Sequence, residues 1–239
     1  MSGELRFILD GKEIPARAGQ TIIDAADEAG IYIPRLCHRP DLEPYGGCRV
    51  CTVSANGRRL AACTQPVAMG MVVESDTEEL NALRRSIVDM LFVEGNHFCM
   101  FCEKSGNCEL QALAYRLGIT APQYPFLYPV RDVDASHPDI LLDRNRCILC
   151  ARCVRASMDL DGKRIFGFVG RGPNRRIAVN GDAKLASTDA DVTDEALDAC
   201  PVGALLKKGQ GFRDPVGQRK FDHEPIGTEI ESGREEVAE

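Results

Sequence analysis

The spacing of eleven cysteines constrains this chain more than any other feature. They form a group of four, a group of three with a histidine just upstream, and a second group of four. Each group therefore offers four side chains that can bind metal, and no cysteine is left over. Three separate donor sets favour several small units in series, each drawing part of its folding energy from a metal centre.

Composition narrows the class further. The opening residues MSGELRFILDGK lack the apolar core of a secretory signal, and no run reaches the roughly 18 apolar residues of a membrane span. We therefore expect a cytoplasmic protein, in whose reducing surroundings CxxC cysteines bind metal more often than they form disulfides. A formal charge of -7 and a pI near 5.3 argue against a non-specific nucleic-acid binder.

The first group has the pattern C-x10-C-x2-C-x11-C and consists of Cys37, Cys48, Cys51 and Cys63. Gly46 and Gly47 stand directly before its central pair, where glycine lets the backbone approach a cluster closely and donate N–H groups to its sulfides. A structural zinc site is the alternative, but zinc usually takes two paired CxxC knuckles, and the outer cysteines here are single. The pattern favours a 2Fe-2S cluster.

The third group has three closely spaced cysteines and one distant member: Cys147, Cys150, Cys153 and Cys200. Three thiolates at C-x2-C-x2-C spacing can hold three irons of a cubane, and a remote Cys-Pro supplies the fourth ligand. In a two-cluster ferredoxin run another cysteine would follow after three residues, where this chain has Ser157. The pattern therefore predicts one 4Fe-4S cluster.

The second group has the pattern H-x-C-x2-C-x5-C and consists of His97, Cys99, Cys102 and Cys108. Three cysteines cannot complete a four-ligand cubane, and His97 is the nearest imidazole, so a second 4Fe-4S cluster is predicted. The alternative is that His97 is an ordinary surface or core residue. His38 adjoins Cys37 and is expected only to flank the first cluster.

Residues 1–76 predict a small α+β unit. Its expected elements are a strand over residues 5–9, a return strand over 12–18, a helix capped by Thr21 and ended by Gly30, a hairpin turning at Asn56-Gly57, and a strand over 71–74. A capping box of Asp76 with Glu79 predicts a helix as far as Gly95. Further expected features are a helix over 109–117, a proline-rich connector over 119–138 and a capped helical turn over 193–199.

From Gly209 onward the chain is polar and broken by prolines, and it has too few apolar groups to fold alone. We expect an extended partner-binding segment that is anchored by apolar side chains, with a disordered end over residues 229–239. The anchors expected are Phe212, Val216, Phe221 and Ile226. The predicted units are a 2Fe-2S domain, a His/Cys-ligated 4Fe-4S domain, a ferredoxin-like 4Fe-4S domain and the tail, at residues 1–76, 77–120, 121–208 and 209–239.

Four motifs in this order, YGGCRVC, CMFCEKSGNCELQ, RCILCARCVRA and ACPVGAL, carry a family resemblance. The chain resembles the amino-terminal iron-sulfur region of the large electron-transfer subunit of respiratory complex I. Within that group it is most similar to the diaphorase iron-sulfur subunits of soluble NAD-reducing [NiFe]-hydrogenases. The resemblance implies a plant-ferredoxin-like (β-grasp) domain followed by two small 4Fe-4S domains. It also implies a partner subunit with FMN and the NAD site, a small hydrogenase subunit and, through it, the large [NiFe] subunit.

One position departs from the complex I pattern. There the histidine stands four residues before its first cysteine, a position held here by Gly95, while His97 stands two residues before Cys99. The chain also lacks the long remainder of the complex I subunit.

The alternatives are the equivalent subunit of a formate dehydrogenase or a complex I-like enzyme, or an iron-sulfur scaffold or redox sensor. No dinucleotide loop, P-loop or hydrolytic triad is present, so no catalytic residue is expected.

Overall fold

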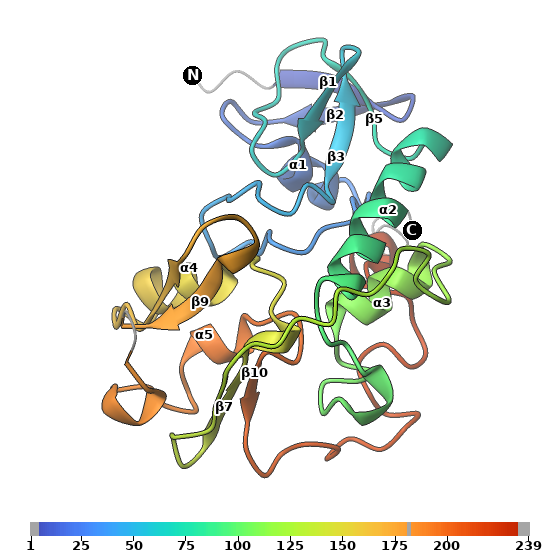
Figure 1. The fold of residues 1–239 in the computed structure, drawn as a ribbon. Coiled ribbons are helices and arrows are strands. Elements are labelled where there is room, and N and C mark those ends of the chain that lie inside the picture. The colour runs from blue at the N-terminus through green and yellow to red at the C-terminus, as the bar shows by residue number, and fades with distance from the viewer. Residues whose placement is uncertain (1–4, 181–182, 234–239) are drawn as a thin grey trace.

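The computed structural model describes residues 5–180 and 183–233. Figure 1 shows an amino-terminal sheet with its helix at one end and the cysteine-rich remainder below it. The amino-terminal elements are β1 (Leu5–Leu9), β2 (Lys12–Ala16), α1 (Ile22–Glu28), β3 (Thr52–Ala55), β4 (Arg58–Ala61) and β5 (Val72–Glu74). Their sheet order is β2-β1-β5-β3-β4, with β1 and β5 parallel and the other pairs antiparallel.

Local sequence explains this first unit. Asp10 and Gly11 both have positive φ in the turn that joins β1 to β2, as an Asp-Gly hairpin requires. The Thr21 side chain accepts from the Asp24 N–H and so caps α1. Ile22 and Ile23 share one apolar core with strand residues of the sheet, among them Phe7. The β-grasp expectation is confirmed.

Two helices follow: α2 (Glu78–Val93) and α3 (Glu109–Arg116). The cap of α2 is Thr77, whose hydroxyl accepts from the Leu80 N–H, so the expected capping box of Asp76 with Glu79 was wrong by one residue. Gly118 follows α3 with a φ of 73°, the left-handed conformation that glycine permits after a helix. Helix α2 joins the amino-terminal sheet to the second cysteine group.

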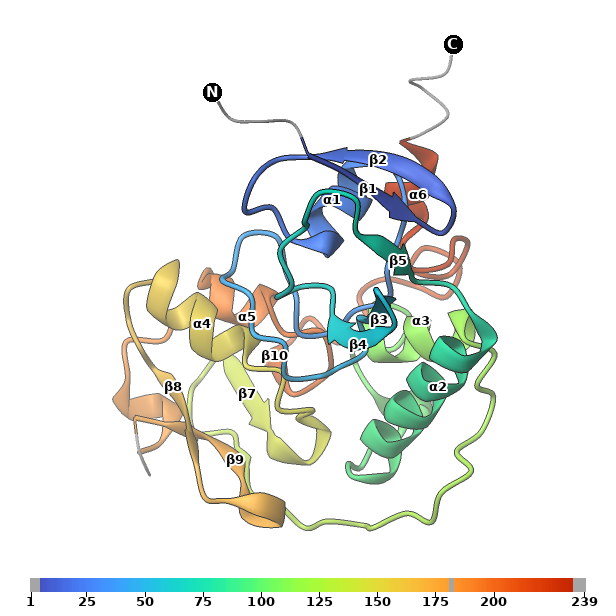
Figure 2. The same cartoon turned by 90° about the horizontal axis from the view of Figure 1, so that it is seen from above.

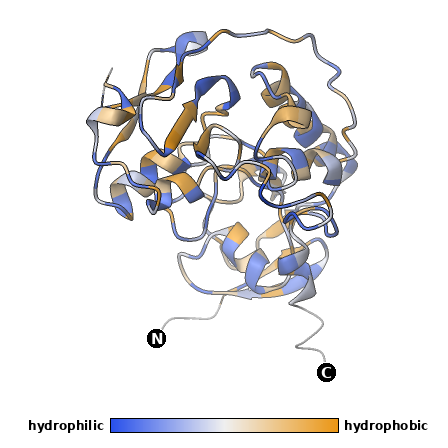
Figure 3. Cartoon of the chain, turned by 90° about the horizontal axis from the view of Figure 1, so that it is seen from below, coloured by the Kyte–Doolittle hydropathy of each residue, from blue (hydrophilic) through white to orange (hydrophobic). Residues whose placement is uncertain are grey.

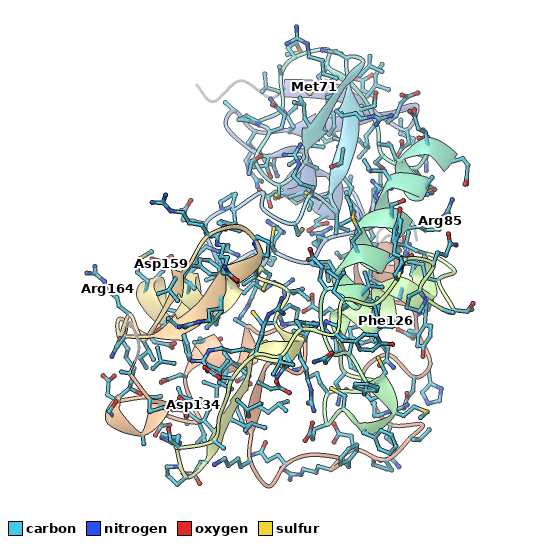
Figure 4. All side chains as sticks on the ribbon, in the orientation of Figure 1. Met71, Arg85, Phe126, Asp134, Asp159 and Arg164 are labelled. Carbon is cyan, nitrogen blue, oxygen red and sulfur yellow. The ribbon has the colours of Figure 1, made fainter. Side chains whose placement is uncertain are left out.

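The third part of the chain has two small sheets. Strand β7 lies between β6 and β10, and β8 pairs with β9. The bounds are β6 (Val133–Asp134), β7 (Ile140–Asp143), α4 (Arg152–Asp159), β8 (Phe166–Val169), β9 (Arg176–Val179), α5 (Glu195–Asp198) and β10 (Leu205–Lys207). Asp134, labelled in Figure 4, accepts from the Ser136 hydroxyl and the Leu185 N–H, which ties β6 to the segment before α5. A single apolar core joins α3, β7, α4 and α5.

The carboxyl-terminal segment differs from the expectation. It runs along the second cysteine loop, where Phe221 N–H donates to the Gly106 carbonyl. It ends in α6 (Thr228–Ser232), which Figure 2 labels and whose Glu231 pairs with Arg116 of α3. Ile226 is buried against the chain's own core, so it and Phe221 are not free anchors. The predicted disorder over residues 229–239 was wrong for α6, and residues 234–239 lie outside the described part.

Hydrophobic and hydrophilic stretches alternate along the same helices and strands in Figure 3, as expected of elements with one buried face. Among the described residues, no helix combines the length and apolar character needed to cross a bilayer.

Candidate cluster-binding sites

The first site lies where two loops of the β-grasp unit meet. Cys51 directly precedes β3 and Cys63 follows β4, while Cys37 and Cys48 lie on the long loop after α1. The Cys37 N–H faces Cys48 Sγ at 3.5 Å. Gly46 turns this loop with a φ of 66°, and a methyl group there would lie 3.0 Å from the Thr64 side chain. The structure therefore brings together all four predicted cysteines of this site.

These four thiols interact with one another. Hydrogen bonding from Cys48 and then Cys63 lowers the pKa of Cys37 to about 2, and the same contacts raise the pKa of Cys48 and Cys63. Hydrogen bonding from Cys63 also lowers the pKa of Cys51 to about 7, so the pKa values of two of the thiols are lowered and those of the other two are raised. Four negative charges at this spacing would repel each other. Four thiolates can coexist here only around a positively charged metal centre, and the iron core of a 2Fe-2S cluster meets this need.

The third site is built from α4, the loop before it and the residue pair after α5. Cys153 lies in the first turn of α4, and Cys200 follows α5, where its Sγ lies 3.1 Å from the Val202 carbonyl oxygen. Leu149 and Ala151 both have positive φ, which winds the loop around its cysteines. No local sequence signal predicted this left-handed entry into α4.

Burial dominates the electrostatics of the third site. Burial, together with the charge of Cys200, raises the pKa of Cys147 to about 11 and that of Cys150 to about 12. Burial also raises the pKa of Cys153, and the charges of the other three cysteines raise it as well, by smaller amounts. These mutual effects require the four side chains to converge, as a cubane site needs.

The second site lies between α2 and α3. Cys99 is the first residue of a single 3-10 turn, and Cys108 is the residue before α3. Burial raises the pKa of Cys108 to about 12. A cavity of about 210 Å³ is lined by His97 and Cys99 together with Phe126, which Figure 4 labels beside α3. The Gln111 side chain holds the loop between the cysteines by accepting from the Gly106 N–H at 2.8 Å.

His97 has the properties of a neutral ligand. Its Nε2 is buried without a hydrogen-bond partner, and a hydrogen bond joins the ring to the Leu91 backbone. Burial, followed by the charge of Arg146, lowers the pKa of His97 to about 4, so the ring is neutral at physiological pH. A neutral imidazole held through one nitrogen and free at the other is the form that binds iron. The ring lies against Gly95, where a methyl group would come within 2.5 Å of Nε2.

Within residues 5–180 and 183–233, no three His, Cys, Asp or Glu side chains are arranged to hold a single metal ion. A cluster needs its donors further apart than one ion does. The three sets fit clusters by their donor chemistry, and the cysteines within each set act electrostatically on one another.

Three arginines that the sequence reasoning missed connect the sites. Arg155 donates to the Cys37 carbonyl at 2.6 Å, and Arg152 donates to the carbonyl of the next residue, His38, at 2.8 Å. Arg146 lies 3.6 Å from Cys102 Sγ. All three arginines lie among the cysteines of the run RCILCARCVRA. This proximity in the sequence was the available signal that they lie near the sites.

A β-grasp unit that carries four cysteines, followed by two further sets of four buried or half-buried donors, defines a multi-cluster iron-sulfur electron-transfer protein. Family models agree with this class. They are a 2Fe-2S iron-sulfur cluster binding domain over residues 2–78, the NADH-ubiquinone oxidoreductase-G iron-sulfur binding region over 84–123, and the ferredoxin-like domain of NADH-quinone oxidoreductase subunit 3 over 137–206. The chain therefore binds one 2Fe-2S and two 4Fe-4S clusters.

The chain is 41% identical over 97% of its length to the NAD-reducing hydrogenase HoxS subunit gamma of Cupriavidus necator, of which it covers 99%. It also matches a chain in the crystal structure of NAD+-reducing [NiFe]-hydrogenase in the H2-reduced state, with a TM-score of 0.92, 48% identity and coverage of 96% and 98%. The chain belongs to the family of these hydrogenase gamma subunits.

More distant relatives are longer. The 78 kDa subunit of mitochondrial NADH-ubiquinone oxidoreductase from Candida albicans is 35% identical over 88% of this chain, which spans 29% of that subunit. The alpha subunit of NADPH-Fe(3+) oxidoreductase from Geobacter sulfurreducens is 35% identical over 86% of this chain, which spans 24% of it. The first of these confirms the resemblance to the iron-sulfur subunit of complex I.

Proposed function

We propose that this chain relays electrons through three iron-sulfur clusters within a multi-subunit NAD-reducing hydrogenase. The observation that carries the proposal is the convergence of three donor sets in one chain whose fold matches a hydrogenase subunit along nearly its whole length. When bound, such clusters accept and donate single electrons.

The proposed ligands follow the three sets. The 2Fe-2S cluster is held by Cys37, Cys48, Cys51 and Cys63. The 4Fe-4S cluster between α2 and α3 is held by His97, Cys99, Cys102 and Cys108. The 4Fe-4S cluster beside α4 is held by Cys147, Cys150, Cys153 and Cys200. The mutual pKa effects within each cysteine group and the free Nε2 of His97 support these assignments.

The proposed partners stand at the two ends of the relay. One is a flavoprotein subunit with FMN and the NAD site, and the other is the small hydrogenase subunit, which leads to the large [NiFe] subunit. The proposed boundaries at residues 76, 120 and 208 lie close to the ends of the matched family regions, at 78, 123 and 206. Exposed Phe212 and Val216 are the remaining candidate partner anchors of the tail.

Reconstitution tests this function. The isolated chain with its clusters should be reduced by dithionite and reoxidised by dyes, but it should neither oxidise H2 nor reduce NAD+, because every cysteine is committed and no dinucleotide motif is present. Adding the flavoprotein and hydrogenase subunits should restore H2-dependent NAD+ reduction. NADH oxidation by the flavin-free single chain would contradict the relay.

A matched pair of variants sharpens the assay. Cys200→Ser should abolish H2-dependent NAD+ reduction in the reassembled complex, because it interrupts the chain of clusters. Asp159→Asn, a change at an exposed position of α4 that removes no proposed ligand, should leave the rate near that of the native chain. Equal rates for both variants would refute the assignment of Cys200.

A further inference from the structure

We propose that Arg146, which belongs to the third cysteine unit, raises the reduction potential of the cluster in the second unit. The proposal rests on the proposed function, since it takes Cys102 as a ligand of that cluster. Arg146 would not be a ligand of the cluster, but it contacts the sulfur atom of one proposed ligand, Cys102.

The geometry begins with a hydrogen bond between units. Arg146 is the last residue of the short 3-10 helix Arg144–Arg146, and the next residue in the sequence is Cys147 of the third site. Its Nη1 nevertheless reaches Cys102 Sγ, 44 residues earlier in the sequence, at 3.6 Å. A charged N–H donor on a thiolate ligand withdraws electron density from the cluster.

Two carboxylates hold the guanidinium in place. Arg146 Nη1 donates to Glu103 Oε2 at 2.7 Å, and Nε lies 3.0 Å from Asp143 Oδ2. The side chain of Arg146 is 20% exposed, so water screens its charge only in part. Glu103 directly follows Cys102, and its negative charge opposes the increase in reduction potential that the positive charge of Arg146 causes.

The backbone behind Cys102 also belongs to the third unit. A methyl group at Gly203, three residues after Cys200, would lie 2.6 Å from Cys102 Sγ and 3.4 Å from Arg146 Nη1. The sulfur is therefore enclosed between Arg146 and the Gly203 backbone. The same guanidinium charge also acts on His97, the proposed imidazole ligand of this cluster. Arg146 thus acts on two ligands of the second site.

The direction of the effect follows from charge. Reduction adds an electron to the cluster, and a nearby fixed cation stabilises the reduced form more than the oxidised form. Removing the positive charge should lower the midpoint potential. Removing the negative charge of Glu103 should raise it, provided that Asp143 still holds the arginine.

The test is an EPR-monitored redox titration of the full chain carrying all three clusters. Arg146→Gln should lower the midpoint potential of the second cluster, Arg146→Lys should stay nearer the native value, and Glu103→Gln should raise it. Arg144→Gln is the matched control, because this buried arginine of the same 3-10 helix donates to the carbonyls of Ile177 and Asp132 instead. It should leave the second cluster's potential unchanged.

An unchanged potential in Arg146→Gln with full cluster content would overturn the proposal. Equal falls in the Gln and Lys variants would also overturn it, because shape rather than charge would then be responsible. If Arg146→Gln loses the cluster, Glu103→Gln decides: a raised potential supports the charge effect and an unchanged one refutes it. Absence of the second cluster from the native chain would instead refute the proposed ligation.

Discussion

Arg152 and Glu109 form a two-pronged ion pair that joins the second and third cysteine units. The two terminal nitrogens of the guanidinium lie 2.7 and 2.8 Å from the two carboxylate oxygens. Arg152 directly precedes Cys153, and Glu109 directly follows Cys108. The same guanidinium donates to the His38 carbonyl, beside Cys37. Arg152 is thus itself the neighbour of a proposed ligand of the third site. Its guanidinium contacts the neighbours of proposed ligands of the other two sites.

The first prediction concerns the stability of this junction. The Arg152 side chain is 5% exposed, so Arg152→Met should leave the Glu109 carboxylate and the His38 carbonyl without their donor. The expected cost is on the order of 3 kcal/mol, or about 6–12 °C in the unfolding midpoint of the anaerobic holoprotein. Arg6→Met, which breaks an exposed pair with Glu13, is the control and should shift the midpoint by less than about 2 °C.

The second prediction concerns His97. Replacement by Ala should remove or degrade only the cluster between α2 and α3, because no other described donor has its free buried Nε2 at this site. Replacement by Cys should keep a cubane at a lower potential, since a thiolate adds negative charge. EPR of the reduced protein distinguishes the clusters.

His137 supplies the control for that experiment. Its Nε2 lies 3.1 Å from the Ala190 carbonyl oxygen, so it is already engaged away from the cysteines. His137→Ala should keep all three EPR signals. If His97→Ala also kept all three, His97 would instead be a residue that supports the ligands without binding iron.

The third prediction concerns Cys200. Cys200→Ser should remove or weaken the third cluster's EPR signal and preserve that of the 2Fe-2S cluster. Cys51 and Cys63 of the 2Fe-2S site lie in the apolar core of the β-grasp unit, whereas Cys200 lies in the other core, against which only Cys48 of that site packs. Simultaneous loss of both signals would show that the two sites do not assemble independently.

The fourth prediction separates two roles of the tail. Ile226→Ala should destabilise the chain by about 2–4 kcal/mol, because Ile226 is buried in the main core. A Phe212→Ser, Val216→Ser double variant should keep native stability and cluster content but weaken co-purification of the partner subunits, because both side chains are exposed. Undiminished co-purification would count against a partner-binding role for these residues.

The sequence predicted the parts of the fold that depend on local signals. The Asp10-Gly11 turn, the Thr21 cap and the Asn56-Gly57 hairpin each act over a few residues, and all are present. Helix α4 was not predicted, because it starts after a left-handed Ala151 and no side chain caps it. The prediction that Ile226 anchors a partner was wrong, because the core that receives this side chain is formed by distant segments.

The candidate sites divide in the same way. Cysteine spacing predicts the grouping of the donors, because most members of each set share one loop, and the mutual effects of the thiols on their pKa values support that grouping. The contacts of Arg146 and Arg152 could not be predicted, since they join residues 43 to 114 positions apart. Such contacts depend on how the units pack, which spacing does not encode.

Iron and acid-labile sulfide analysis of the anaerobically reconstituted native chain tests the central claim most directly. One 2Fe-2S and two 4Fe-4S clusters predict about ten irons and ten sulfides per chain. About six irons and six sulfides per chain would mean that one of the two cubanes is absent, and would contradict a relay of three clusters.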